Sequence, residues 1–359
     1  MRLTRIYLIA AAVAAISIIG SYAALYRYQL GAPILASYDV KNWLRLKERV
    51  AANTQGSKIL MVGDSNVLFG FDSTYAQSKL GRPVVNMGLH GGLPMDWILS
   101  VAVRNAKPGD TVVFPLVWLY YTSDYSAPSD WMLDQIVAWD VEYLNSLPFN
   151  RRLKYFTALS PLKLVQNVDT QMNRGAVLKA NPHRKLLPKD EALAYYDQVA
   201  SMQTAFSYTY LNMNARGDMR HTCGHLVEVS GASYPPPAKA KVNPKTVKLM
   251  VDTIKLLRAR GVQAYVSASV VVDDETTRAP RFQKLLTDIW GELRSNGVPL
   301  IGSPTDYFFP PHAFFNTNFH LNCDATRART EIFVKKFEEA VNASSGANAD
   351  VTPTNRDAG

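Results

Sequence analysis

The chain has 359 residues, of which 47% are hydrophobic and 19% are charged, with 20 Gly, 20 Pro and two Cys. This composition excludes a disordered tail, a collagen-like fibre and a disulfide-rich miniprotein, and the length suffices for one large or two ordinary domains. The formal charge is +9, but lysine and arginine are scattered singly rather than in dense runs, so nucleic acid is not an expected partner.

The N-terminal segment, residues 1–27, has the pattern of a membrane anchor or a signal segment. Two arginines precede residues 6–25, which carry no charge. Twenty apolar residues can cross a bilayer, and basic residues before a first span favour a cytoplasmic N-terminus. The small residues Ser21 and Ala23 also fit cleavage by signal peptidase. With either outcome, we expect the rest of the chain on the non-cytoplasmic side.

Apolar runs and helical periods alternate along much of the remaining chain. Short apolar runs predict buried strands at 58–62, 83–86, 111–116, 262–272 and 298–301. Amphipathic stretches predict helices at 95–105, 244–260, 280–295 and 325–341, the last of them capped by Asp324. Strands that alternate with helices predict an α/β fold with a doubly wound parallel sheet in three layers.

The alternation is interrupted, which divides the chain into segments. Residues 28–56 are expected to form a juxtamembrane helical segment. Residues 57–123 and 243–341 form the α/β core, and 124–242, rich in aromatic residues and proline, form an insertion or cap over the site. The small and polar residues 342–359 are expected to be disordered.

Cys223 and Cys323 are the two cysteines of the chain. In an oxidising compartment such a pair often forms a disulfide, which would tie the middle of the chain to its C-terminal part. Two buried reduced thiols are the alternative, because the distance between them cannot be read from the sequence.

A candidate nucleophile and a candidate base stand at the expected functional edge of the sheet. Ser65 follows the first strand in the turn Gly-Asp-Ser-Asn, and His320 precedes the last helix. Open α/β sheets bind ligands at the carboxyl ends of their strands, and a serine becomes a nucleophile only with a base in reach. By itself, the turn is equally well an aspartate-capped helix start.

Three short blocks resemble, in chain order, those of the SGNH/GDSL hydrolase superfamily. They are ILMVGDSNVLFGFDS around Ser65, VVNMGLHGG after the second strand, and His320-Leu321-Asn322. The frame is similar to membrane-anchored SGNH-like proteins of bacterial surface-polysaccharide systems, such as alginate-type O-acetyltransferases and the D-alanyl-transfer protein of teichoic acid operons. The resemblance covers 57–116 and 262–340.

The resemblance implies a role for individual residues. Ser65 would be the nucleophile and would supply one backbone oxyanion donor, with the amide of Gly88 as a second and His320 as the general base. The family's side-chain oxyanion donor has no counterpart after the third strand, and Asn66 or Asn86 could take its place.

The acid that orients the histidine in this family is missing from its usual position. Thr317 and Asn316 occupy the places three and four residues before His320. Asn316 could hold the imidazole through its amide oxygen, Asp306 or Asp324 could reach it from elsewhere, or the site could be a Ser-His dyad of low activity.

Trp118, Tyr120 and Tyr121 follow the third strand and could stack on sugar rings, although packing of the cap is the alternative for each. His90 and His312 also lie near this edge and are expected to be structural.

Together, these features predict an extracytoplasmic serine O-acyltransferase or esterase that acts on acyl groups, acetyl above all, of a cell-surface polysaccharide. The alternative is a weakly active or inactive polysaccharide-binding or assembly subunit. No metal and no cofactor are expected. The resemblance implies a single-pass protein of the bacterial inner membrane with its main domain in the periplasm, and a multi-span membrane acyltransferase as a partner.

Overall fold

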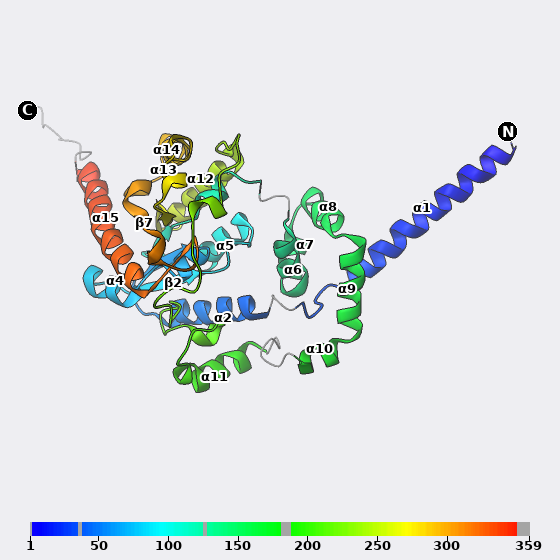
Figure 1. Cartoon of the computed structure of the whole chain (residues 1–359), viewed down its shortest axis with the longest axis horizontal. Helices are drawn as coiled ribbons and strands as arrows, with labels where there is room; N and C mark the ends of the chain where they lie inside the picture. Colours follow the sequence, from blue (N-terminus) through cyan, green and yellow to red (C-terminus); the bar gives the residue numbers. More distant parts are fainter. Residues whose placement is uncertain (1, 35–37, 125–127, 181–187, 350–359) are drawn as a thin grey trace, which may run out of the picture. The chain divides into compact units, whose positions relative to one another are not determined.

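A computed structural model describes residues 2–34, 38–124, 128–180 and 188–349. The chain divides into two units, one formed by residues 1–42 and 125–192 and the other by 43–124 and 193–359. The first unit is helical and the second is an α/β unit, and the division falls within helices α2 and α11 (Figure 1).

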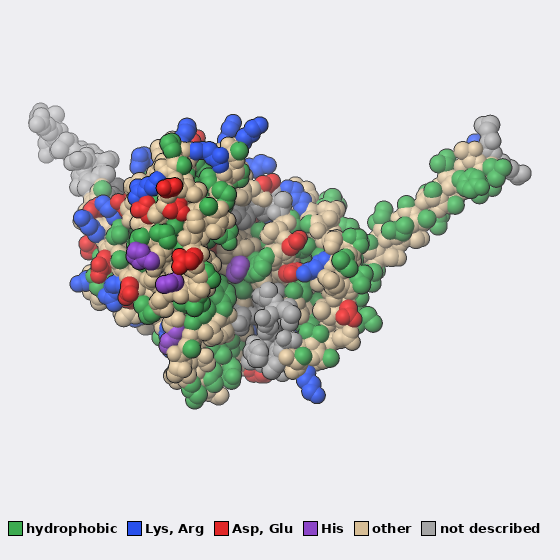
Figure 2. Space-filling view, in the orientation of Figure 1, with side chains coloured by type: hydrophobic (Ala, Val, Ile, Leu, Met, Phe, Trp, Pro, Cys, Tyr) green, Lys and Arg blue, Asp and Glu red, His purple; other side chains and the backbone are tan. Residues whose placement is uncertain are grey.

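The helical unit begins with the N-terminal helix α1 (Arg2–Tyr28), which is largely exposed and contacts α9. Its other helices are α6 (Asp130–Trp139), α7 (Val141–Ser146), α8 (Phe149–Ala158), α9 (Pro161–Met172) and α10 (Arg174–Ala180). Among the described residues, α1 is the one helix that is long and apolar enough to cross a membrane, as an anchor or a signal sequence would be. Figure 2 shows hydrophobic side chains along its length.

The α/β unit contains a five-stranded parallel sheet. Its strands are β1 (Ile59–Gly63), β2 (Val84–Gly88), β3 (Thr111–Phe114), β4 (Gln263–Ser267) and β6 (Leu300–Ile301). They lie in the order β2-β1-β3-β4-β6, which is the 2-1-3-4-5 order of one common doubly wound arrangement. The predicted doubly wound parallel sheet is thereby confirmed.

Helices cover both faces of this sheet, so the predicted three layers are present. Helices α4 (Ser73–Leu80) and α15 (Cys323–Ala349) lie on one face, and α5 (Met95–Asn105) and α12 (Pro244–Ala259) on the other, where α14 (Pro280–Ser295) packs beside α12. Successive side chains of a strand point to opposite faces, so every second residue faces α15.

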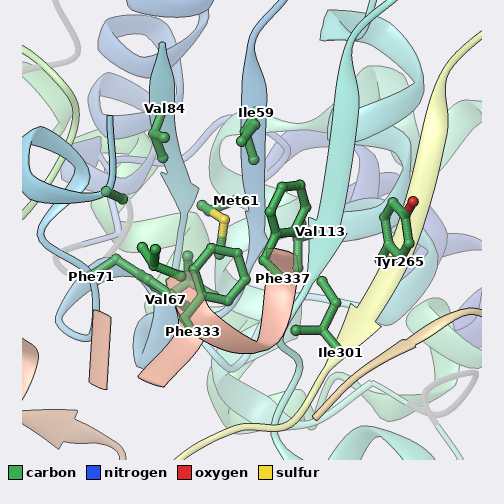
Figure 3. Packing of buried hydrophobic residues seen from close by; sticks show 12 residues of the cluster. Ile59, Met61, Val67, Phe71, Val84, Val113, Tyr265, Ile301, Phe333 and Phe337 are labelled. Carbon is green, nitrogen blue, oxygen red and sulfur yellow. The ribbon is translucent and has the colours of Figure 1, made fainter. Parts of the chain in front are cut away.

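The main hydrophobic core lies between the sheet and α15. In Figure 3, Ile59 and Met61 of β1 face Phe333 and Phe337 of α15, and these four side chains are at most 5% exposed. Apolar residues four apart on a helix share a face, so Phe333 and Phe337 pack against the sheet together. This packing carries the N-terminal end of α15, and the residues before it, to the carboxyl ends of the strands.

The smaller elements complete the α/β unit, with α2 and α11 shared between the two units. They are helices α2 (Tyr38–Asn53), α3 (Ser65–Leu68), α11 (Lys189–Val199) and α13 (Glu275–Arg278), the parallel pair β5 (Val271–Val272) and β7 (Phe308–Phe309), and the antiparallel pair β8 (Phe314–Thr317) and β9 (His320–Leu321).

The boundaries of several predicted elements change. The predicted strand at 262–272 is two strands, β4 and β5, which belong to different sheets. The N-terminal cap of α15 is the side chain of Asn322, which accepts a hydrogen bond from the amide of Ala325 at 3.0 Å, and not Asp324 as predicted. Residues 342–349 continue α15 rather than forming a disordered tail, and 350–359 lie outside the described residues.

The predicted insertion is not a single structural segment. Residues 125–192 group with α1, whereas 193–242 group with the α/β unit. The second part is bonded to the sheet region, because Asn86 N donates to Arg216 O at 2.9 Å and Met219 N donates to Leu68 O. The predicted juxtamembrane segment is divided as well, since most of α2 belongs to the α/β unit.

A disulfide joins Cys223 to Cys323, with their Cα atoms 4.7 Å apart. It links the second part of the predicted insertion to the start of α15, three residues after His320. The two cysteines that the sequence left open as a pair or as free thiols are therefore paired.

Candidate functional site

Ser65 is the first residue of α3, immediately after the turn that ends β1. The carboxylate of Asp64 shapes this turn, because it accepts hydrogen bonds from Asn66 N at 2.8 Å and from Val117 N at 2.9 Å. Gly63 has no room for a side chain, since an added Cβ would lie 2.5 Å from a methyl carbon of Val67. The turn leaves Ser65 half-buried.

His320 lies in β9, and its ring packs on Phe69, the residue that follows α3. The Phe69 ring stacks on the imidazole with centroids 3.9 Å apart and an angle of 4° between the planes. His320 is 5% exposed. Burial lowers the pKa of His320 to about 3, with a further contribution from His90, so the imidazole is neutral over the physiological range.

Asn316 contacts the imidazole at Nδ1, the ring nitrogen that the proposed proton transfer does not use. Its amide oxygen lies 2.7 Å from His320 Nδ1. An amide oxygen only accepts, so Nδ1 of the neutral ring carries the hydrogen and Nε2 keeps its lone pair. Of the three arrangements considered for the missing acid, the structure contains the one in which Asn316 contacts the histidine.

The other two candidate acids do not contact the histidine. Asp306 accepts a hydrogen bond from Ser303 N at 2.7 Å and caps the short helix at Pro304–Tyr307. Asp324 is exposed in the first turn of α15. Neither aspartate is hydrogen-bonded to His320 within the described part of the chain.

Ser65 and His320 lie on contacting elements, since α3 packs against β9. In the described part of the chain, however, no hydrogen bond joins the Ser65 hydroxyl to the imidazole. Hydrogen bonds of catalytic groups are often long or absent in structures without substrate and form when substrate binds.

His90 is a third polar residue of this site. It follows β2 at the same edge of the sheet, and its Nδ1 accepts a hydrogen bond from Gly92 N at 3.0 Å. Burial lowers the pKa of His90 to about 4. A Cβ added to the neighbouring Gly91 would lie 3.9 Å from Ser65 Oγ, so this turn borders the serine. The sequence placed His90 near this edge because it follows the predicted second strand.

Asn66 and Gly88, two of the predicted oxyanion donors besides Ser65, are engaged in structural bonds. Both hydrogens of the Asn66 amide are used, by Asp64 Oδ1 at 2.8 Å and by Pro115 O at 2.6 Å. Gly88 N donates to Asn86 Oδ1 at 2.9 Å. The assignments of Asn66 and Gly88 as oxyanion donors are therefore wrong for this structure, because their N–H groups point to acceptors within the fold.

The backbone N–H of Ser65 differs from these two. Within the described residues, no acceptor is recorded for it. The first N–H groups of a helix have no partner inside the helix, and here the one at Ser65 stands next to the candidate nucleophile.

A buried hydrogen-bond network that contains an arginine and an aspartate holds α3 in place. Arg329 of α15 is fully buried and donates to Asn66 O at 2.6 Å and to Asn66 Oδ1 at 2.7 Å, so Asn66 links it to Asp64. Burial lowers the pKa of Arg329 to about 10 and raises the pKa of Asp64. The sequence analysis missed Arg329, since nothing in its local pattern separates it from a solvated helix residue.

A similar network surrounds Asn86 of β2. Lys47 of α2 donates to Asn86 O at 2.8 Å and to Gly217 O at 2.6 Å, and the Asn86 amide donates to Asp218 Oδ1 at 3.0 Å. Burial lowers the pKa of Lys47 to about 7. Asn86 is thus a structural residue rather than an oxyanion donor.

The three aromatic residues proposed to bind sugar are buried. Trp118, Tyr120 and Tyr121 are 5%, 0% and 1% exposed. The hydroxyl of Tyr120 donates to Gly91 O at 2.7 Å, and Trp118 packs edge-on against Phe282. The prediction that they bind substrate is wrong, because their rings fill the interior behind the site.

Within residues 2–34, 38–124, 128–180 and 188–349, no three His, Cys, Asp or Glu side chains gather in a group that could hold a metal ion.

Comparisons with known proteins leave the family open. No family model matches the chain, and no curated protein matches it. A solved structure, the C-terminal domain of glucosamine-fructose-6-phosphate aminotransferase from Francisella tularensis, matches 84% of this chain and 94% of its own length at 10% identity. Its TM-score is 0.15, a similarity too low to carry an argument about fold or function.

Proposed function

We propose that this chain is an SGNH-like serine O-acyltransferase or esterase that acts on acyl groups of a cell-surface polysaccharide through an acyl-enzyme on Ser65. One observation carries the proposal. A neutral His320 is held through Nδ1 by the amide oxygen of Asn316 at 2.7 Å, on a strand packed against the helix that Ser65 begins.

The chemistry requires a proton acceptor and an oxyanion donor beside the serine. His320 Nε2 takes the Ser65 proton while Oγ bonds to the carbonyl carbon of the ester, and the negative oxygen accepts a hydrogen bond from the backbone N–H of Ser65. The alcohol then leaves with the proton from His320, and the acyl group remains on Ser65. Water or a sugar hydroxyl attacks this ester in the same way, which gives hydrolysis or transfer.

This mechanism requires the hydroxyl of Ser65 and the imidazole to form a hydrogen bond when substrate binds. Stacking on Phe69 and the bond to Asn316 restrict rotation of the imidazole, so the serine side chain is the group that moves.

The proposed compartment is the periplasm, with a single-pass anchor in a bacterial inner membrane. An N-terminal helix suited to a membrane and a disulfide, which forms in oxidising compartments, support it. Of the formal charge of +9, all but the contribution of Arg2 and Arg5 before the span lies on the proposed periplasmic side, which suits an anionic polymer. A multi-span membrane acyltransferase that delivers the acyl group is part of the proposal.

A non-catalytic polysaccharide-binding subunit is the second candidate. It is favoured by the lack of a hydrogen bond between Ser65 and His320 in the described residues and by an amide in place of the carboxylate behind the imidazole. Replacing the acid of a serine-protease triad by asparagine lowers turnover about ten-thousandfold.

Hydrolysis of a chromogenic acetyl ester by the full chain in detergent separates these two candidates. We expect Ser65→Ala to lose the activity and to lose labelling by a fluorophosphonate. Ser78→Ala is the matched control, because Ser78 is exposed on α4. Equal hydrolysis by Ser65→Ala and the unmodified protein would exclude the acyl-enzyme on Ser65. No hydrolysis and no labelling of the unmodified protein would leave the binding subunit.

A further inference from the structure

Helices α8 and α9 of the helical unit expose large apolar side chains. Phe149 is 71% exposed, Leu162 70%, Val165 61% and Met172 71%. On α9 the positions 162, 165 and 172 are spaced by three and seven residues, which places them on one face of the helix. Single exposed apolar residues are common on soluble proteins, but a stripe along one face of a helix indicates a contact.

The turn between these helices is bonded to the end of α1. The hydroxyl of Tyr22 lies 2.5 Å from Leu159 O and 3.0 Å from Phe156 O and shares its one hydrogen between these two acceptors. The rings of Tyr22 and Phe156 pack edge to face with centroids 4.9 Å apart. Figure 1 shows α9 lying across the carboxyl end of α1.

This contact determines how deep α8 and α9 lie relative to the surface of a membrane that α1 crosses. The uncharged span ends at Leu25, three residues after Tyr22, and three residues of helix rise about 5 Å. A bilayer that holds the span therefore reaches the turn at Phe156 and Leu159, so α8 and α9 lie at the level of the lipid headgroups.

The charge of this region suits lipid. Residues 149–180 contain six basic residues and one acidic residue, which is +5 of the +9 carried by the whole chain. An anionic membrane surface attracts lysine and arginine side chains that lie within about a Debye length of it.

From these observations we infer that α8 and α9 lie on the bilayer as an interfacial collar around the end of α1, with Leu162, Val165 and Met172 in the boundary between anionic headgroups and acyl chains. The inference requires α1 to remain attached and to cross the membrane, and it is independent of any chemistry at Ser65. The collar would limit tilting of α1 and of the helical unit.

Spin labels on the full chain test this arrangement. Both native cysteines are in the disulfide, so a single introduced cysteine takes the label. Val165→Cys and Met172→Cys are compared in vesicles of phosphatidylcholine and phosphatidylglycerol with Ile16→Cys in the span and Gly291→Cys on α14. The two stripe positions are largely exposed, so the label requires no repacking.

The readout is the collision rate with oxygen, which dissolves in lipid, relative to a water-soluble nickel chelate. We expect ratios at Val165 and Met172 that are several-fold above that at Gly291 and approach that at Ile16. Ratios equal to that at Gly291 would overturn the inference, as would protection from both reagents, which would mean that a protein covers the stripe. Unchanged ratios in vesicles without anionic lipid would overturn the anionic-lipid assignment.

Discussion

Replacing Asn316 by aspartate tests the base and its orienting residue together. The amide oxygen lies 2.7 Å from His320 Nδ1, and aspartate differs from asparagine mainly in placing a negative charge there. Asn316 is half-buried, so its side chain can ionise. The variant restores the carboxylate that typical members of the resembled family carry behind their histidine.

The expected shift of the histidine pKa follows from Coulomb attraction. Two charges about 4 Å apart attract each other by about 4 kcal/mol at the effective dielectric constant near a protein surface. One pKa unit corresponds to about 1.4 kcal/mol, so the pKa of His320 should rise by about three units, from about 3 to about 6.

This shift has a defined sign in a pH–rate profile. In the unmodified protein His320 is deprotonated throughout pH 5 to 9, so it contributes no change in rate over this range. In Asn316→Asp the rate should fall as the pH drops through about 6, because His320 gains a proton, and it should exceed the unmodified rate at pH 8, because the base is stronger.

The assay is ester hydrolysis from pH 5 to 9, together with an NMR titration of His320, which reports the pKa without requiring activity. Asn145→Asp, at an exposed position on α7, is the control for the added charge. A pKa of His320 that stays below 4 in Asn316→Asp would refute the contact from which the shift was calculated.

Three further predictions follow from the geometry. Gly91→Ala should fold normally, since its Cβ makes ordinary contacts at 3.8 and 3.9 Å, yet lower ester hydrolysis at least tenfold by filling the space beside Ser65 Oγ; Gly291→Ala, with open space around it, is the control, and equal effects on rate would contradict the site. Acidification from pH 7 to 5 should cost about 2 kcal/mol of stability through His320 alone, because only the unfolded state binds its proton between pH 6.5 and about 3, and His320→Gln should flatten this dependence in urea unfolding. Reduction of the disulfide, whose cysteines are 100 residues apart, should cost about 4 to 5 kcal/mol, and a melting temperature unchanged by dithiothreitol would show that the bond does not stabilise the fold.

The sequence alone located the sheet and most of its helices, because hydrophobic periodicity is a local property. The helices at 95–105 and 280–295 have the predicted bounds, and the strands of the sheet lie within one or two residues of the predicted runs where these were short. The turn at Ser65 was predictable for the same reason, since a strand, a glycine and a capping aspartate follow one another directly.

Only the tertiary structure decided which polar groups are free at the site. Asn66 is satisfied by Arg329, which lies 263 residues away, and Gly88 is close to α3 and bonded to Asn86. The Arg329 partner is distant in the chain, and even the partners two residues away, Asp64 and Asn86, become bonded only in the backbone geometry that the packed fold imposes. An asparagine that is free and one that is engaged therefore look the same in the sequence.

The same holds for burial and for the division of the chain. Trp118, Tyr120 and Tyr121 could equally have faced solvent, and no composition change marks residue 193, where the predicted insertion passes from the helical unit to the α/β unit. The local sequence pattern determined the helices and strands and the places of the candidate serine and histidine among them. Packing between distant parts of the chain decided which side chains can reach a substrate, because burial and hydrogen bonding depend on residues distant in the chain.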